Sequence, residues 1–243
     1  TSDQTVTITI DGEAPSITGL SGSLGDETSS IYLQGGSDSI GTFSSDETVT
    51  WSIDGGADAA LFNIEENSGV LTFLSAPDAL SPTDSDENNE YLLNIKATDL
   101  VENSSTQSVT VIIDETAPEI TGPQGSSTGD LTSTTSIDEN TNAVLTFSAN
   151  ETVAWSKNGG SDSSKFNLDS STGELTFINA PDFENKLDSD TNNDYEIIVR
   201  ATDSAGNTSD QTLTVNINDV DDVLPSIQGA SGNAGDETST ASV

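Results

Sequence analysis

The chain of 243 residues carries 42 acids, 5 bases and no histidine, which gives a formal net charge of −37. Without a basic patch to neutralise phosphates, this composition argues against nucleic acid and against anionic membrane surfaces as partners. With neither histidine nor cysteine, the Ser-His-Asp and Cys-His catalytic arrangements cannot be built. No run approaches the ~20 apolar residues of a membrane span. Two interpretations of the charge remain, a chain that binds cations or a chain adapted to high salt.

An internal repeat organises the sequence. Residues 51–113 recur at 155–217 with a constant offset of 104 and no gap, so that Trp51 recurs as Trp155. Because this period is about the length of one β-sandwich domain, the chain is predicted to be a linear tandem array. The predicted parts are the last strand of a preceding repeat, two complete repeats and the start of a following repeat, at 1–13, 14–116, 117–223 and 224–243.

Alternating apolar and polar residues predict short strands along each repeat. In the second repeat they are expected near Ile120 and at 143–149, 152–156, 165–169, 174–178, 195–201 and 211–217. Seven short strands separated by glycine- and asparagine-containing turns predict an all-β, antiparallel Greek-key sandwich of cadherin or immunoglobulin type. Its core is expected to contain Leu145, Phe147, Trp155, Phe166, Leu168, Leu175, Phe177, Tyr195, Ile197, Val199, Leu213, Val215 and Ile217.

Five segments of the second repeat form a linked set of motifs. They are Glu139 in Ile-Asp-Glu-Asn, the Ser-Thr-Gly strand at 171–177, the Asp-Phe-Glu at 182–184, the Ala-Thr-Asp at 201–203 and the acidic linker at 219–225. Together they resemble a bacterial cadherin-like domain of the kind strung along giant RTX-type surface adhesins. The resemblance implies a Greek-key sandwich that holds calcium at the domain boundary with its acidic residues.

The first repeat departs from this pattern. Leu80 stands at the position of Glu184, Glu102 stands at the position of Gly206, and the linker to Pro118 is three residues shorter than its counterpart. This shorter linker is closer to those of bacterial Ig-like repeats. The two joints are therefore expected to differ in calcium occupancy and in stiffness.

Calcium prefers six to eight oxygen ligands, and carboxylates forced together at a domain tip repel one another unless a cation lies among them. The candidate ligands at the second repeat's junction are Glu139, Asp182, Glu184, Asp203, Asp219, Asp221 and Asp222. At the first junction they are Asp78, Asp99, Asp114 and Glu115. The alternative interpretation is a solvated acidic linker without a bound ion.

A second kind of candidate lies within each repeat. The segments 84–89 and 188–193 place oxygen side chains at positions i, i+2, i+4 and i+5. Their candidate ligands are Asp84, Asp86, Asn88, Asp188, Asp190 and Asn192. The spacing resembles the first half of an EF-hand loop, but Ile95 and Val199 occupy the place of the final glutamate, so an EF-hand is rejected. A free-standing calcium loop and a loop of Asx turns remain as alternatives.

These features predict a non-enzymatic, calcium-rigidified extender or adhesion repeat of a large extracellular bacterial surface protein or filament. Its partners would be the neighbouring repeats of the same chain and, in a filament or matrix, other copies of itself. The alternatives are a self-associating biofilm module and a carbohydrate-binding module. Trp51 and Trp155 could stack on a sugar, but both fall at inward-facing strand positions, which favours core packing. A halophile's acidic surface without specific sites is the remaining competitor.

Overall fold

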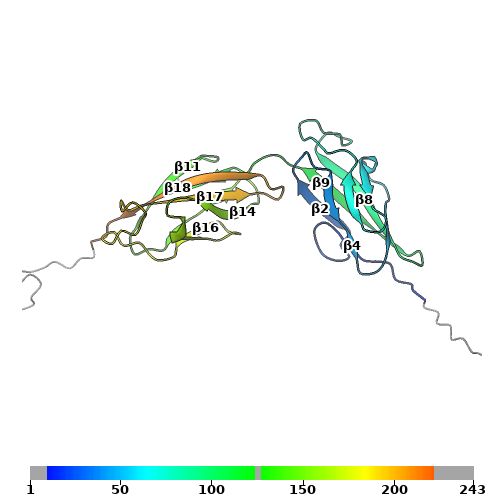
Figure 1. Cartoon of the computed structure of the whole chain (residues 1–243), viewed down its shortest axis with the longest axis horizontal. Helices are drawn as coiled ribbons and strands as arrows, with labels where there is room; N and C mark the ends of the chain where they lie inside the picture. Colours follow the sequence, from blue (N-terminus) through cyan, green and yellow to red (C-terminus); the bar gives the residue numbers. More distant parts are fainter. Residues whose placement is uncertain (1–9, 124–126, 222–243) are drawn as a thin grey trace, which may run out of the picture.

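The structure is a computed structural model that describes residues 10–123 and 127–221. The described chain is almost entirely β, with two short 3-10 turns, and its strands fall into a first domain at 17–113 and a second at 120–218. The two domains follow one another along the longest axis of the molecule (Figure 1). The predicted all-β sandwich class is confirmed. The predicted flanking pieces lie outside the described residues apart from 10–13.

The first domain consists of two facing sheets and a small strand pair. The sheets have the strand orders β2-β9-β8-β5 and β3-β7-β6, and β1 pairs with β4. The elements are β1 (Ile17–Thr18), β2 (Thr28–Leu33), β3 (Ser39–Thr42), β4 (Ser44–Ser45), β5 (Thr50–Ile53), η1 (Ala59–Leu61), β6 (Phe62–Ile64), β7 (Val70–Phe73), β8 (Glu90–Thr98) and β9 (Ser104–Ile113).

The second domain repeats this topology, with the orders β11-β18-β17-β14 and β12-β16-β15 and the pair β10-β13. The seven strands expected are present when β12 and β13 are counted as one interrupted strand, and β11 is an additional strand. The elements are β10 (Ile120–Thr121), β11 (Thr132–Asp138), β12 (Ala143–Thr146), β13 (Ser148–Ala149), β14 (Ala154–Gly159), η2 (Ser163–Lys165), β15 (Phe166–Leu168), β16 (Glu174–Phe177), β17 (Asp194–Thr202) and β18 (Thr208–Asn218).

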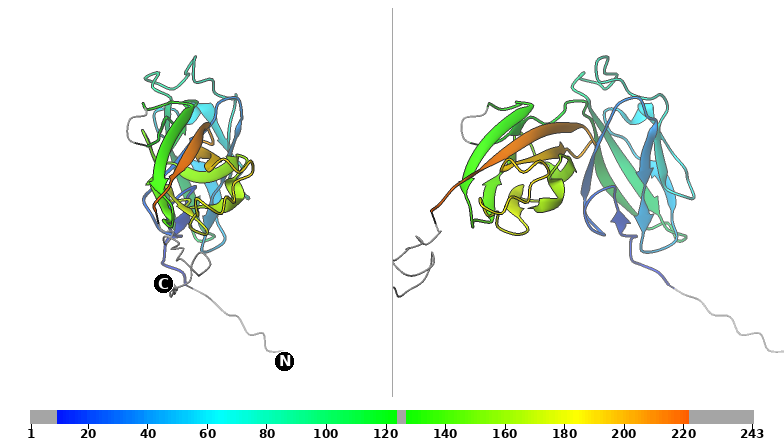
Figure 2. Two further views of the ribbon diagram at one scale, coloured as in Figure 1. Left: turned by 90° about the vertical axis from the view of Figure 1, so that its left-hand side faces the viewer. Right: turned by 60° about the vertical axis from the view of Figure 1, so that its left-hand side comes forward.

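Strand β11 was not predicted, and it corrects the expectation of a wholly antiparallel sandwich. It runs parallel to β18, from the pair Thr132–Thr212 to the pair Asp138–Asn218, and the two strands lie side by side in Figure 2. The sequence of β11 is mostly serine and threonine, so it lacks the apolar alternation that marks the other strands. Its inward contact is polar instead, because the buried Ser133 hydroxyl donates a 2.9 Å hydrogen bond to Gln211 Oε1.

The predicted core of the second domain is confirmed at all but two positions. Eleven of the expected side chains are buried, whereas Leu145 and Leu168 are partly buried against that core. An aromatic group lies at its centre, where the ring of Phe177 lies 4.3 Å from that of Phe166 and 5.0 Å, edge-on, from that of Tyr195. Trp155 is only 6% exposed, so its ring packs in the core as its register predicted.

Candidate functional site

Three groups of acidic residues bring carboxylate oxygens within 4.8 Å of one another in the described parts of the chain. We call Asp11, Glu47 and Asp99 the first leading cluster, and Asp114, Glu151 and Asp203 the second leading cluster. Glu139, Glu184 and Asp219 form the trailing cluster. The leading clusters lie where the chain enters each domain, and the trailing cluster lies where it leaves the second. At such separations, unit charges repel by roughly 4 kcal/mol near a protein surface.

The second leading cluster is built from three separate segments. Asp114 follows β9 in the linker, Glu151 follows β13, and Asp203 follows β17. Asp203 is 8% exposed and is held firmly. Its Oδ1 accepts hydrogen bonds from the backbone nitrogens of Gly206 at 2.7 Å and Asn207 at 2.8 Å. These bonds fix one carboxylate of the cluster in a defined position before any ligand arrives.

Asn207 joins this cluster to the first domain. Its Nδ2 donates to Asp203 Oδ2 at 2.8 Å and to the backbone oxygen of Asp114 at 3.0 Å. Its Oδ1 accepts a 2.9 Å hydrogen bond from Nε2 of Gln34, the residue that follows β2. The second leading cluster therefore lies at the joint between the two described domains.

The leading clusters carry more negative charge than their surroundings neutralise. Burial raises the pKa of Glu151, and the charges of Asp203 and Asp114 raise it further. Burial likewise raises the pKa of Glu47, with added repulsion from Asp11 and other acids around it. Each of these carboxylates would be stabilised either by a proton or by a cation among its neighbours. The repetition of this property in both domains follows from the repeated sequence.

The trailing cluster ties together the three segments that meet at the far end of the second domain. Glu139 follows β11 and is 3% exposed. Its Oε2 accepts a 2.8 Å hydrogen bond from the backbone nitrogen of Phe183, and its Oε1 accepts one of 2.9 Å from that of Val220. The side chain thereby holds both the loop that carries Glu184 and the segment that carries Asp219.

The remaining second-junction candidates have different roles or positions. Asp182 Oδ1 accepts hydrogen bonds from the backbone nitrogens of Glu184 at 3.1 Å and Asn185 at 3.0 Å, which is the geometry of an Asx turn. Asp221 is exposed at the end of the described chain. Asp222 lies outside the described residues.

The first domain lacks the counterpart of the trailing cluster. Gly35, Leu80 and Glu115 occupy the positions of Glu139, Glu184 and Asp219, so two of the three carboxylates are missing. Leu80 is 91% exposed, and Asp78 caps its backbone nitrogen at 2.9 Å. The joint between the two domains thus has a carboxylate cluster only on the side of the second domain.

The expected grouping of Asp99 and Asp203 is wrong. Asp99 was grouped with Asp114, but these residues lie at opposite ends of the ten-residue strand β9, roughly 30 Å apart. Asp203 was grouped with Asp219, from which the eleven-residue strand β18 separates it in the same way. In the fold, each Ala-Thr-Asp aspartate belongs to the leading end of its own domain. Asp203 therefore joins Asp114.

Sequence reasoning also missed Asp11, Glu47 and Glu151. A signal for two of them was present, because Glu47-Thr48-Val49 recurs as Glu151-Thr152-Val153 at the same offset of 104. The repeat therefore extends upstream of Trp51. Extending the comparison would have shown that an acid recurs just before β5 and β14. Which other acids it meets depends on the connections between strands, which no spacing reveals.

The internal loops contain the predicted Asx-type hydrogen bonds. Asn192 donates from its backbone nitrogen to Asp188 Oδ2 at 2.7 Å and from Nδ2 to Asp190 Oδ2 at 3.0 Å. Asn88 makes the same pair of bonds to Asp84 at 2.8 Å and to Asp86 at 3.0 Å. A hydrogen bond with the Asp188 carboxyl raises the pKa of Asp190, and desolvation by the surrounding loop adds to that effect.

Two buried aspartates that the sequence did not single out support these loops. Asp162 is 1% exposed and accepts hydrogen bonds from the backbone nitrogens of Ser189 at 2.7 Å and Glu196 at 3.0 Å. Asp58 is its counterpart in the first domain, with a 2.6 Å bond from the nitrogen of Ser85. Each aspartate fixes the middle of its loop to the sheet.

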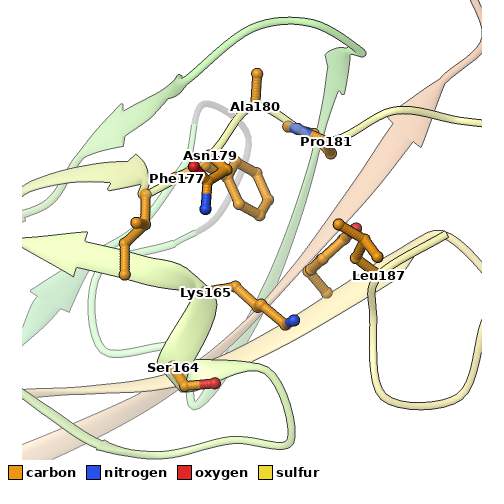
Figure 3. Close-up of a pocket in the computed structure, with 9 residues that line it drawn as sticks. Ser164, Lys165, Phe177, Asn179, Ala180, Pro181 and Leu187 are labelled. Atoms are coloured by element: carbon orange, nitrogen blue, oxygen red, sulfur yellow. The ribbon is translucent and has the colours of Figure 1, made fainter. Parts of the chain in front are cut away.

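An apolar pocket lies beside the second domain's loop. It has a volume of about 220 Å³, and Lys165, Phe177, Pro181 and Leu187 are among its lining residues (Figure 3). The lining contains no aspartate or glutamate. The pocket therefore does not supply the two flanking carboxylates that a glycosidase of the common type requires.

No family model and no curated protein matches the chain. Solved structures that resemble it include human CDH23 EC21–23, with a TM-score of 0.39 and 15% identity over 90% of this chain and 74% of that one. Drosophila N-cadherin EC1–3 matches with a TM-score of 0.34 and 19% identity, over 86% of this chain and 68% of that one. Protocadherin gamma B2 extracellular cadherin domains 3–6 match with a TM-score of 0.37 and 17% identity over 85% of this chain. The chain spans about half (52%) of that fragment. No helix of the described residues is long and apolar enough to cross a membrane.

Proposed function

We propose that the chain is a calcium-rigidified extender segment of an extracellular bacterial surface protein or surface filament. Calcium bound at the ends of the domains would cancel the repulsion among clustered carboxylates and hold successive domains in a fixed relation. The string of domains would then behave as a rod outside the cell, where calcium is abundant. Extracellular calcium modules typically bind the ion at about 10⁻⁴ to 10⁻³ M, so such sites fill there and empty in the cytoplasm.

The observation that carries this proposal is the composition of the second leading cluster. Asp114 comes from the linker, whereas Glu151 and Asp203 come from the second domain. A cation shared by the three would cross-link the linker to the domain it precedes. Asn207 and Gln34 extend the same network into the first domain, so the ion would lie within the joint rather than beside it.

The donor set fits a hard divalent cation. All three side chains offer carboxylate oxygens, and histidine and cysteine, the donors that zinc and copper favour, are absent from the chain. Calcium accepts irregular sets of carboxylates, carbonyls and waters, whereas magnesium demands a near-ideal octahedron. A partly solvated cluster of three acids therefore suits calcium better.

The absence of cysteine makes the test direct, because two labels can be placed by substitution alone. Ser52→Cys in the first domain and Ser156→Cys in the second introduce exposed thiols for spin labels. Pulsed electron paramagnetic resonance then gives the distribution of distances between the two spin labels, one on each domain. We expect millimolar calcium to narrow this distribution relative to chelator, and Glu151→Gln to abolish the narrowing.

Glu174→Gln is the matched control, because it removes one exposed acid that belongs to none of the clusters. It should leave the calcium response intact. An equal distribution width in calcium and in chelator would overturn the proposal. If sodium chloride at matched ionic strength narrowed the distribution as well as calcium does, a halophile's acidic surface would be the better account.

A second candidate function is self-association through a sheet edge. Strand β2 is the terminal strand of its sheet, and Tyr32 on it is 42% exposed. An unpaired edge is a template for pairing with another copy. Sedimentation velocity across calcium and protein concentrations tests this, and monomers throughout would exclude it. Carbohydrate stacking is disfavoured, because the rings of Trp51 and Trp155 are 5% and 6% exposed.

A further inference from the structure

The loop 188–193 contains two acidic side chains that converge on one residue and belong to none of the three carboxylate clusters. Asn192 donates to Asp188 through its backbone and to Asp190 through its side chain, so both carboxylates are drawn to the same asparagine. Asp188 is 5% exposed. Arg200–Asp210 is the salt bridge found among the described residues, and no basic side chain pairs with the acids of this loop. Two negative charges therefore share a small, partly buried volume.

Two oxygens in this loop have no hydrogen-bond partner. They are Asp188 Oδ1 and Asn193 Oδ1, and both side chains are more than nine-tenths buried. Buried polar atoms almost always have partners, and a carboxylate oxygen without one carries a large desolvation penalty. The first domain repeats part of this pattern, because Asn89 Oδ1, at the position of Asn193, is also buried without a partner. The counterpart of Asp188 Oδ1 differs, since Asp84 Oδ1 accepts a 3.3 Å hydrogen bond from the backbone nitrogen of Asn89. The recurrence of the asparagine oxygen without a partner at the same offset shows that the repeated sequence produces it.

We propose that each domain binds one calcium ion within this loop, separately from any ion at the joints. The ligands in the second domain are the carboxylates of Asp188 and Asp190 and the amide oxygen of Asn193. In the first domain they are the carboxylates of Asp84 and Asp86 and the amide oxygen of Asn89. The ion supplies the missing partner of the buried oxygens and neutralises the paired acids. An all-oxygen set that includes a neutral amide suits calcium.

The surrounding structure holds this loop in place from outside. The Asp162 carboxylate accepts a hydrogen bond from the backbone nitrogen of Ser189, which lies between the two acids. It accepts another from the backbone nitrogen of Glu196 in β17. The loop is thus fastened to the sheet by a side chain that is not itself a ligand. Asp58 does the same in the first domain through Ser85 and Leu92. Such support lowers the cost of ordering the ligands when the ion binds.

The loop also contacts the segment that builds the trailing cluster. Asn193 Nδ2 donates a 3.0 Å hydrogen bond to the backbone oxygen of Phe183, whose nitrogen donates to Glu139. In the first domain the equivalent bond, from Asn89 Nδ2 to the backbone oxygen of Ala79, is present at 3.0 Å although that domain lacks the trailing cluster. The loop site therefore does not depend on the trailing cluster, and the first domain allows it to be tested in the absence of that cluster.

Calorimetric titration of the full chain with calcium chloride measures the number of sites. We expect Asp190→Asn to remove one site per chain and the double variant Asp86→Asn/Asp190→Asn to remove two. Both residues are exposed, so these variants should fold. Glu174→Gln is the control of equal charge change and should keep every site. An unchanged stoichiometry in the double variant overturns the proposal and would indicate that water fills the loops.

Amide hydrogen exchange on the wild-type chain gives a second measurement that needs no variant. Calcium is expected to slow exchange across 84–90 and 188–194 relative to chelator, and Glu151→Gln should leave this protection intact. Protection confined to the linker and the domain ends would overturn the loop sites while leaving calcium at the joint in place. Protection confined to the loops would overturn calcium binding at the joint and support the loop sites. The two proposals therefore fail separately.

Discussion

Gln34 of the first domain donates a 2.9 Å hydrogen bond to Oδ1 of Asn207 in the second. The two residues are 173 positions apart in the sequence, and the bond joins the end of β2 to the turn between β17 and β18. Because Asn207 also bonds to Asp203 and to the backbone of Asp114, the contact between the domains and the acidic cluster form one network. Substitutions in this network can therefore separate domain stability from joint stiffness.

Asn207→Ala should weaken both the second domain and the joint. It removes the side-chain bonds to Asp203, to the linker and to Gln34, and keeps the backbone bond to Asp203. We expect it to lower the free energy of unfolding of the second domain by about 1–3 kcal/mol. Urea unfolding followed by Trp155 fluorescence in a Trp51→Phe background measures this quantity. Gln34→Ala is the matched comparison, because it breaks only the contact between domains. It should broaden the distance distribution without changing the unfolding midpoint.

Protonation of Glu151 should contribute stability to the second domain when calcium is absent and the pH falls. The pKa of Glu151 is raised in the folded protein, first by burial and then by Asp203 and Asp114. A carboxyl with a raised folded pKa contributes stability below its unfolded pKa, ordinarily about 4.3, and this contribution is lost as the pH rises through the folded pKa. In chelator, the urea midpoint of the wild type should therefore fall more, or rise less, between pH 4 and 7 than the midpoint of Glu151→Gln does. Equal slopes in the two proteins would contradict this assignment, and calcium should flatten the slope of the wild type.

The missing trailing cluster of the first domain should be restorable. Gly35→Glu/Leu80→Glu places carboxylates at the positions of Glu139 and Glu184, beside the Glu115 that is already there. The Glu115 carboxylate lies where the Cβ of a side chain at Gly35 would begin, so Glu115 must shift and the carboxylates of residues 35 and 115 become neighbours. We expect calorimetry to show one additional calcium site and a narrower distance distribution. The control variant Gly35→Gln/Leu80→Gln has side chains of the same size without the charge. It should show neither the additional calcium site nor the narrower distance distribution.

The buried pair of Ser133 and Gln211 should contribute measurably to stability. Ser133→Ala leaves Gln211 Oε1, in a fully buried side chain, without the 2.9 Å hydrogen bond that it accepts from the serine hydroxyl. The expected loss is about 1–3 kcal/mol in the free energy of unfolding. Ser136→Ala on the exposed side of the same strand should change it by less than about 0.5 kcal/mol. Similar losses for both variants would show that strand propensity, not the buried bond, sets the effect.

The elements that sequence could predict are those with apolar alternation. Strands β17 and β18 present a buried residue at every second position, so both the strands and most of their core residues were found. Strand β11 could not be found in this way, because its buried position is Ser133 and its partner is a glutamine on the last strand. A polar contact between residues 78 positions apart leaves no local periodicity.

The candidate sites show a similar division. The loop candidates follow one another in sequence, so their spacing alone placed them in one loop of each domain, and their binding of calcium stays a proposal. The clusters at the domain ends combine residues from three separate elements, and their membership depends on strand order. Motif positions placed Asp203 with Asp219, whereas the length of β18 puts them at opposite ends of the domain. Asp162 was missed because a buried carboxylate that accepts only backbone hydrogen bonds has no characteristic neighbour in sequence.

The parallel pairing of first and last strands has a mechanical consequence. In the second domain β11 and β18 are aligned over seven residue pairs, and β2 and β9 over six pairs in the first. Tension applied to the two ends of a domain would pull these partners in opposite directions along their length. The hydrogen bonds between the two strands would then be loaded in shear and would have to break together. They could not open one after another from the end of the strand pair. A domain with this geometry should resist stretching well beyond what its thermal stability suggests.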